Sequence, residues 1–153
     1  MLEIGKKSPN FERPRDGQGS LSSQDFAGKT LVIFFYPKDD TSGCTKEAIG
    51  FTEHLAEFEA AGAAVIGVSK DRVAKHDKFI AKHNLNIPLL SDVNGQMCED
   101  FGVWKEKSIY GRTYMGIERS TFVIDGNGVI REMWTKVRVK GHVEAVLEVV
   151  QNL

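Results

Sequence analysis

The stretch TLVIFFYPKDDTSGCTKEA (residues 30–48) begins as an unbroken run of apolar, β-branched and aromatic residues and turns polar at Pro37. This composition is typical of a strand that is buried on both faces of a sheet. Beyond the polar segment, apolar residues recur at steps of three and four, on one face of a helix: Ala48, Phe51, Leu55 and Phe58. The stretch therefore predicts a central strand that leads through a short loop into an amphipathic helix.

A second apolar run, AAVIGVS (63–69), follows Gly62, where the helix should end. Strand, helix and strand, with near-continuous apolar strands, indicate a parallel crossover unit. Farther along, the hydrophobic pattern predicts a helix after Asp71, a short strand in 87–92 and a short helix in 94–102.

The remaining elements complete a recognisable plan. Segments 120–125 and 129–134 flank a Gly-Asn-Gly turn, which indicates an antiparallel hairpin, and 141–151 has the pattern of a closing helix. Segment 12–20 is expected to be an irregular loop with a small hairpin. A parallel half followed by an antiparallel hairpin and a last helix predicts an α/β, thioredoxin-like fold with a central mixed β-sheet flanked by helices.

The bulk composition is that of one ordinary globular domain, which we expect to span residues 1–153. A net charge of −1 gives no reason to expect a nucleic-acid partner. The start MLEIGKKSPN lacks an apolar signal segment, and the longest apolar run is too short to cross a bilayer. Two cysteines do not make a disulfide scaffold. We expect a cytoplasmic protein without a membrane partner.

Cys44 falls in the first turn of the predicted helix, at the carboxyl end of the central strand. A lone cysteine is often only a small buried hydrophobic residue. However, the unpaired N–H groups and the macrodipole of a helix amino-terminus stabilise a thiolate. Lys46 adds positive charge nearby, although Asp39 and Asp40 oppose it. The position favours a nucleophile.

Missing motifs exclude several reactions of such a nucleophile. Dithiol exchange needs C-x-x-C, and the third residue after Cys44 is Glu47. Acyl transfer needs a histidine base, and the four histidines lie on surfaces or in helices where no pattern directs them toward Cys44. Peroxide reduction remains, because it needs only a thiolate and donors for the departing oxygen. Thr41 can aim its hydroxyl into the same pocket, and Pro37 can shield the thiolate from water.

The segment PKDDTSGC (37–44) resembles the peroxiredoxin active-site signature P-x-x-x-T-x-x-C. The resemblance continues through GVSKDRVAKHDKF, PLLSD, FGVWKEK, YGRTYMGIERSTFVID and VKGHVEAVL. In this ordered set the chain is similar to the PrxQ subfamily of peroxiredoxins, also called bacterioferritin comigratory protein, over nearly its whole length.

The resemblance implies an antioxidant thiol peroxidase that reduces hydrogen peroxide and organic hydroperoxides through a sulfenic acid at Cys44. It also implies active-site hydrogen bonding by Thr41 and by the guanidinium of Arg119, whose fixed fork of donors can hold two oxygens together. Glu47 either accepts a hydrogen bond from Arg119 or is a solvated helix residue. The resemblance implies no metal, haem or flavin. Thioredoxin is the implied reductant, with glutaredoxin or glutathione as alternatives, and the protein is expected to be monomeric.

Cys98 is where the sequence departs from the commonest PrxQ pattern. Many PrxQ proteins carry a resolving cysteine five residues after the peroxidatic one, where this chain has Ile49, or on the next helix, which here has none. Cys98 either resolves Cys44 after local unfolding of the first helix or packs as a small core residue. We expect the core role, and therefore one-cysteine behaviour in which an external thiol reduces Cys44.

A non-enzymatic alternative stays open at this point. Cys44 could be a redox sensor whose oxidation changes the binding of a partner protein. Sensing alone would require only a reactive thiol, so the combination of Pro37, Thr41 and Arg119 with Cys44 favours catalysis.

Overall fold

The computed structural model describes residues 2–153, with a five-stranded mixed sheet at the centre. In spatial order its strands are β5 (Leu89–Ser91), β4 (Ala63–Ser69), β3 (Thr30–Phe35), β8 (Ser120–Ile124) and β9 (Ile130–Trp134). The first three run parallel, β8 is antiparallel to β3, and β9 is antiparallel to β8. The predicted parallel crossover unit and the predicted hairpin are both confirmed.

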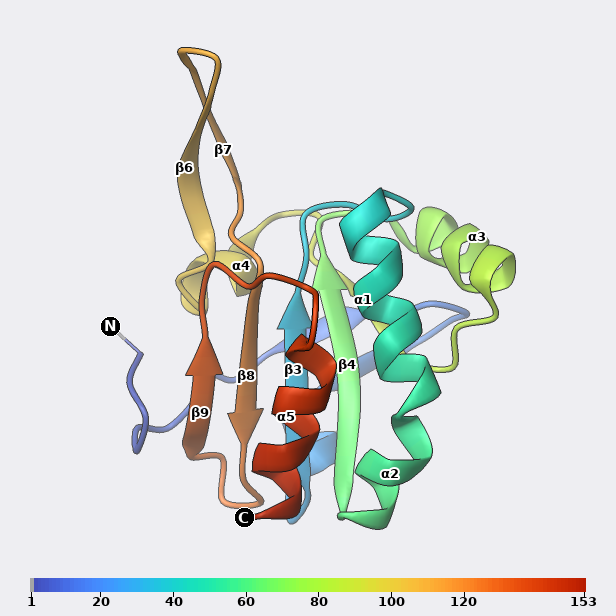
Figure 1. Cartoon of the computed structure of the whole chain (residues 1–153), viewed down its shortest axis with the longest axis vertical. Helices are drawn as coiled ribbons and strands as arrows, with labels where there is room; N and C mark the ends of the chain where they lie inside the picture. The colour runs from blue at the N-terminus through green and yellow to red at the C-terminus, as the bar shows by residue number, and fades with distance from the viewer. Residues whose placement is uncertain (1) are drawn as a thin grey trace.

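The α-helices follow the predicted order: α1 (Ser42–Glu53), α2 (Leu55–Ala60), α3 (Val73–His83), α4 (Gln96–Asp100) and α5 (His142–Gln151). The helix predicted after the central strand is divided at His54, which ends α1 and precedes α2. Its apolar face continues across the break, since Phe51 and Phe58 are both buried. Helices α1, α2 and α5 lie over the same face of the sheet (Figure 1).

The amino-terminal segment forms the small hairpin that the sequence predicts, from β1 (Glu12–Pro14) and β2 (Ser20–Ser22). A short 3-10 helix, η1 (Ser23–Phe26), then leads to β3. Within residues 2–153, no helix combines the length and the apolar character that crossing a membrane would require.

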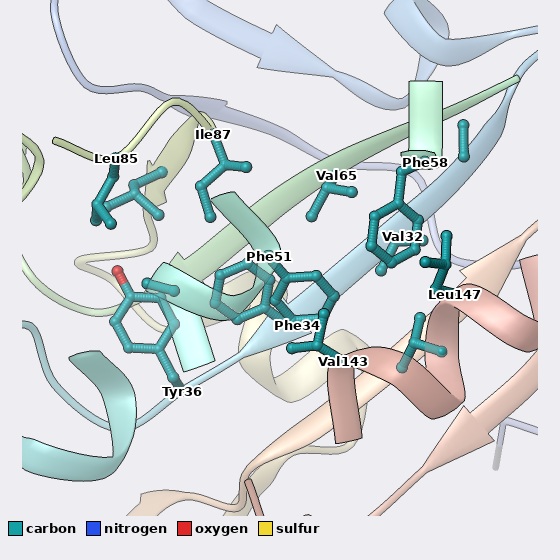
Figure 2. Packing of buried hydrophobic residues seen from close by; sticks show 14 of the residues in the cluster. Val32, Phe34, Tyr36, Phe51, Phe58, Val65, Leu85, Ile87, Val143 and Leu147 are labelled. Carbon is teal, nitrogen blue, oxygen red and sulfur yellow. The ribbon is translucent and has the colours of Figure 1, made fainter. Parts of the chain in front are cut away.

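Alternation along β3 divides the buried side chains into two clusters, one on each face of the sheet. Val32 and Phe34 point into the cluster beneath α1 and α5, where Phe34 stacks on Phe51 (Figure 2). Ile33 and Phe35 point into the opposite cluster, to which α4 contributes. Burial of each such side chain stabilises the fold by roughly 1.5–3 kcal/mol. The continuous apolar run in the sequence is thus explained by burial on both faces.

A second hairpin, β6 (Trp104–Ile109) with β7 (Arg112–Ile117), was not predicted from the sequence. It projects away from the rest of the chain (Figure 1). Tyr110 and Gly111 form its turn, and both have positive φ (50° and 80°), as a two-residue hairpin turn of type I′ requires. Because most of the ribbon is exposed, it has no continuous apolar face, and hydrophobic periodicity does not reveal it.

Candidate active site

Cys44 is the third residue of α1, and its side chain is only 1% exposed. The loop of residues 36–41 carries the chain from the end of β3 to this helix. Thr41 is the N-cap, with extended backbone, and its carbonyl oxygen accepts a hydrogen bond from the Thr45 N–H. The sulfur therefore lies in the first helical turn at the carboxyl edge of the sheet, as the sequence predicts.

Arg119 reaches the sulfur from the link between β7 and β8. Because Ser120 pairs with Phe35 at the end of β3, Arg119 emerges beside the loop that enters α1. Its Nη2 donates to Cys44 Sγ at 3.3 Å, and its Nη1 donates to Glu47 Oε1 at 2.7 Å. Of the two alternatives for Glu47, the structure shows the hydrogen bond to Arg119.

Glu47 is one turn after Cys44 on α1 and is completely buried. Its Oε1 bonds to Arg119, whereas its Oε2 has no hydrogen-bond partner within residues 2–153. Burial raises the pKa of this carboxyl group from 4.5 to about 7, and the positive charge of Arg119 opposes the rise only in part. For Arg119 the balance is reversed: burial lowers its pKa, but Glu47 and Cys44 outweigh burial and raise it. The guanidinium therefore stays charged beside the sulfur.

Gly43 lets the guanidinium lie close to the backbone of α1. A Cβ at this position would stand 3.2 Å from Arg119 Nη2, which is tighter than most such contacts. This is the same nitrogen that donates to Cys44. The missing side chain at position 43 therefore permits the observed distance between Arg119 and the sulfur.

Lys107 of β6 adds a second cation to the site, and sequence reasoning missed it. Burial and then the charge of Arg119 lower the pKa of Lys107, while Cys44 and Glu118 oppose this shift. The middle of the projecting hairpin, where Lys107 pairs with Tyr114, thus lies within electrostatic range of the sulfur. No local signal could have shown this, because it depends on how the unpredicted hairpin sits beside Arg119.

The two other residues singled out from the sequence, Thr41 and Pro37, are exposed in the loop before α1. The Thr41 hydroxyl donates to the carbonyl oxygen of Lys38 at 2.9 Å. Its proton therefore stabilises the loop, while its oxygen can accept a hydrogen bond from a substrate. Among residues 2–153, the hydrogen-bond donor to the Cys44 sulfur is Arg119 rather than Thr41.

His142 is a buried histidine at the start of α5, and its Nε2 bonds to the Thr121 hydroxyl at 2.8 Å. Burial and the charge of Arg119 lower the pKa of His142 to about 4, so the ring is neutral at pH 7. Within residues 2–153 no histidine hydrogen-bonds to the Cys44 sulfur. The described structure places no acyl-transfer base in contact with the thiol.

Cys98 lies in α4 and is fully buried. It belongs to the cluster on one face of the sheet, whereas Cys44 belongs to the cluster on the other face. Burial and the neighbouring Asp92 carboxylate raise the pKa of Cys98, so its thiol strongly prefers the protonated form. The central strand β3 separates the two thiols, and this arrangement favours the core role for Cys98.

One group of potential metal ligands occurs within residues 2–153: Asp39, Asp71 and His76, whose ligand atoms lie within 4.8 Å of one another. These atoms already bond to protein groups. Asp39 Oδ2 bonds to His76 Nδ1, and Asp71 Oδ2 accepts from the Asp39 N–H and from the Ser69 hydroxyl. The group is therefore a hydrogen-bond network.

Comparison with known proteins gives matches along most of the chain. The AhpC/TSA family profile matches residues 4–133. The chain is 49% identical over 147 residues to peroxiredoxin Bcp of Xanthomonas campestris pv. campestris, covering 96% of this chain and 92% of that protein. It is 45% identical over 152 residues to peroxiredoxin Bcp of Bacillus subtilis, covering 99% and 97%.

Solved structures give the same result. A cysteine-to-serine variant of PrxQ from Xylella fastidiosa has a TM-score of 0.95 and 38% identity, covering 99% of this chain and 97% of that one. The bacterioferritin comigratory protein of Xanthomonas campestris was solved as trapped intermediate and ligand complexes to explain its alkyl peroxide reduction. It has a TM-score of 0.89 and 43% identity, covering 93% and 90%. These superpositions confirm the predicted thioredoxin-like fold.

Proposed function

Because the chain belongs to the AhpC/TSA family, within its peroxiredoxin Q (Bcp) group, and is a thiol-dependent peroxidase, we propose that Cys44 is the thiol that reacts with peroxide. The observation that carries the proposal is the fork of Arg119, which holds the Cys44 sulfur with one nitrogen and Glu47 with the other. A charged guanidinium in this position stabilises a thiolate and can also reach an oxygen that approaches the sulfur.

Cys44 and Arg119 suffice for the reduction of a peroxide. The Cys44 thiolate attacks one peroxide oxygen, the O–O bond breaks, and the sulfur becomes a sulfenic acid. The departing oxygen gains negative charge, which Arg119 stabilises, and it leaves as water or an alcohol after taking up a proton. Thr41 accepts a hydrogen bond from the bound peroxide, and Pro37 limits the access of water to the sulfur. Substrates are hydrogen peroxide and organic hydroperoxides; the alkyl peroxide reduction of the Xanthomonas campestris relative supports the second class.

An external thiol completes the cycle. One thiol condenses with the sulfenic acid, releases water and forms a mixed disulfide, and a second thiol then frees Cys44 as its own disulfide forms. We propose thioredoxin as the physiological reductant, with glutaredoxin or glutathione as alternatives. Cys98 does not act as the resolving thiol, since it is buried in the cluster across β3.

Substitution of Cys44 by serine tests the assignment. Cys44→Ser should abolish peroxide consumption with thioredoxin, thioredoxin reductase and NADPH, and it should leave the circular dichroism spectrum unchanged, because a serine hydroxyl stays protonated at neutral pH. Cys98→Ser is the matched control, since it changes the other buried thiol. Turnover of Cys44→Ser within tenfold of wild type would exclude Cys44 as the peroxidatic residue.

The same assay separates catalysis from sensing. A peroxidase at catalytic concentration consumes many equivalents of peroxide in the presence of excess reductant, whereas a pure sensor consumes about one. We further propose that residues 1–153 act as one domain, that the protein is a monomer and that it works in the cytoplasm. Sedimentation and fractionation test the last two statements.

A further inference from the structure

A buried polar network joins the loop before Cys44 to helix α3. The Asp39 carboxylate accepts a hydrogen bond from the Tyr36 hydroxyl at 2.6 Å and bonds to Nδ1 of His76 at 2.7 Å. Nε2 of His76 contacts the carbonyl oxygen of Leu90, on β5, at 2.9 Å. The exposure of Tyr36, Asp39 and His76 is at most 2%, so water does not compete for these bonds.

The partners of His76 define its charge. A carbonyl oxygen can only accept, so Nε2 carries a proton and donates to Leu90. Nδ1 faces a carboxylate oxygen of Asp39, and a proton shared by these groups resides on the imidazole, which is the stronger base. Burial lowers the pKa of His76, but Asp39 and the Leu90 carbonyl outweigh burial and raise it. His76 is therefore an imidazolium paired with a buried carboxylate.

Other groups around His76 reinforce this arrangement. The Asp39 backbone N–H donates to Asp71 Oδ2 at 2.7 Å, so Asp39 is held by its backbone as well as by its side chain. Asp71 also forms an ion pair with Lys75, which lies four residues later in the first turn of α3. Burial, and next the charge of Asp39, raise the pKa of Tyr36, which keeps it a phenol that donates. Asp39 is thus fixed from the end of β3, from the start of α3 and from His76.

We propose that His76 is a positioning residue of the peroxidase reaction, an inference that rests on the proposed function of Cys44. Asp39 is five residues before Cys44, and the N-cap Thr41 lies between them. When His76 fixes Asp39 against α3, it fixes the loop that starts α1. It thereby keeps the Cys44 sulfur within reach of Arg119.

Loss of the bond from His76 has a defined consequence. The buried Oδ2 of Asp39 would be left without a hydrogen-bond donor, which is unfavourable for a charged group. Local opening of the loop exposes this carboxylate to water and relieves the penalty. The same opening moves Cys44 away from Arg119 and exposes its sulfur.

Two neutral substitutions separate the two bonds of the imidazolium. In His76→Asn the side-chain amide nitrogen takes the place of Nδ1 and can still donate to Asp39. In His76→Gln it takes the place of Nε2 and can donate only to Leu90. Both variants lose the charge, and Asn leaves the larger gap, so a slower reaction of His76→Gln reports on the bond to Asp39 and not on lost volume.

The expected results differ between the two variants. His76→Gln should oxidise with peroxide roughly 10- to 100-fold more slowly than wild type, the effect of losing a buried hydrogen bond to a charged group. Its Cys44 should react faster with iodoacetamide, and its amides in 41–47 should exchange faster with deuterium while those of the sheet stay protected. His76→Asn should keep its peroxide rate constant within about fivefold of wild type. His83→Gln is the control, because this less buried histidine on the same helix bonds to the exposed Asp40.

Equal peroxide rate constants for His76→Asn and His76→Gln would overturn the proposal, and so would a loss of protection throughout the sheet in His76→Gln. The alkylation and exchange measurements require no peroxidase activity. If wild type itself consumed no peroxide, the proposed function would fail, and these two measurements would still decide whether His76 holds the loop.

Discussion

Gly43→Ala offers a test of how the Arg119 fork sets the rate. The new Cβ would stand 3.2 Å from Arg119 Nη2, so this nitrogen must retreat by a few tenths of an ångström. It now donates to Cys44 Sγ at 3.3 Å, and the retreat would lengthen and weaken that hydrogen bond. A hydrogen bond to a charged group contributes about 1.5–3 kcal/mol, and losing about half of it corresponds to a roughly 3- to 13-fold slower reaction.

The expected effect on stability has the opposite sign. Position 43 lies in the first turn of α1 and does not have positive φ, so alanine fits the backbone there. Replacing glycine by alanine in a helix stabilises a protein by about 0.5–1 kcal/mol. The variant should therefore react more slowly although it unfolds at an equal or higher urea concentration.

The assay is stopped-flow oxidation of the reduced protein by hydrogen peroxide, together with urea unfolding. Ser42→Ala, an exposed change in the same turn, should react at the wild-type rate. In an Arg119→Ala background, Gly43→Ala should have little further effect, because the nitrogen that it displaces is gone. A wild-type rate constant for the folded Gly43→Ala variant would refute the reasoning that the contact between Nη2 and Sγ limits the reaction.

Three further predictions concern the same site. Arg119→Ala should lower the peroxide rate constant by roughly 10²-fold or more, and Arg119→Lys should restore only part of it, because an ammonium group lacks the planar fork. If both variants reacted at the wild-type rate, Arg119 would have only a structural role. Glu47 has its pKa raised to about 7 in the folded protein, so its contribution to stability is present below pH 4.5 and is lost as pH rises through 7. Between pH 4.5 and 8, wild type should therefore lose about 3 kcal/mol of unfolding free energy relative to Glu47→Gln, and a constant difference in urea titrations would contradict this. After one equivalent of peroxide without oxygen, mass spectrometry should find sulfenic or mixed-disulfide Cys44 in wild type and in Cys98→Ser alike, whereas a disulfide between Cys44 and Cys98 would show that the sheet does not keep them apart.

Local patterns in the sequence were enough to predict the main architecture. The apolar runs of β3 and β4 and the periodic face of α1 and α2 predict a parallel crossover unit. A strand buried on both faces is apolar at every position, whereas a helix buried on one face is apolar at every third or fourth position. The position of Cys44 in the first turn of α1 follows from the same pattern. The β6–β7 hairpin was not predicted because its side chains are mostly exposed, so its sequence has no pattern of buried apolar residues.

The environment of each site residue was decided by the tertiary structure. Arg119 meets Cys44 across 75 residues only because β8 pairs with β3 in one register, and the same pairing brings it to the buried carboxylate of Glu47. His76 shares a helical face with Val73 and Phe79, which marks it as inward-facing, but its partner Asp39 lies in a loop 37 residues earlier.

For this protein the sequence by itself determined the strands of the central sheet, the helices and the place of the reactive thiol, since these depend on neighbours along the chain. Only the tertiary structure decided that Cys98 lies across the sheet from Cys44, that Glu47 is buried against Arg119 and that His76 bonds to Asp39. The physical reason is that burial, pKa and hydrogen-bond geometry depend on distances in space. Those distances are set when segments far apart in the sequence pack together, and they cannot be read from the local hydrophobic pattern.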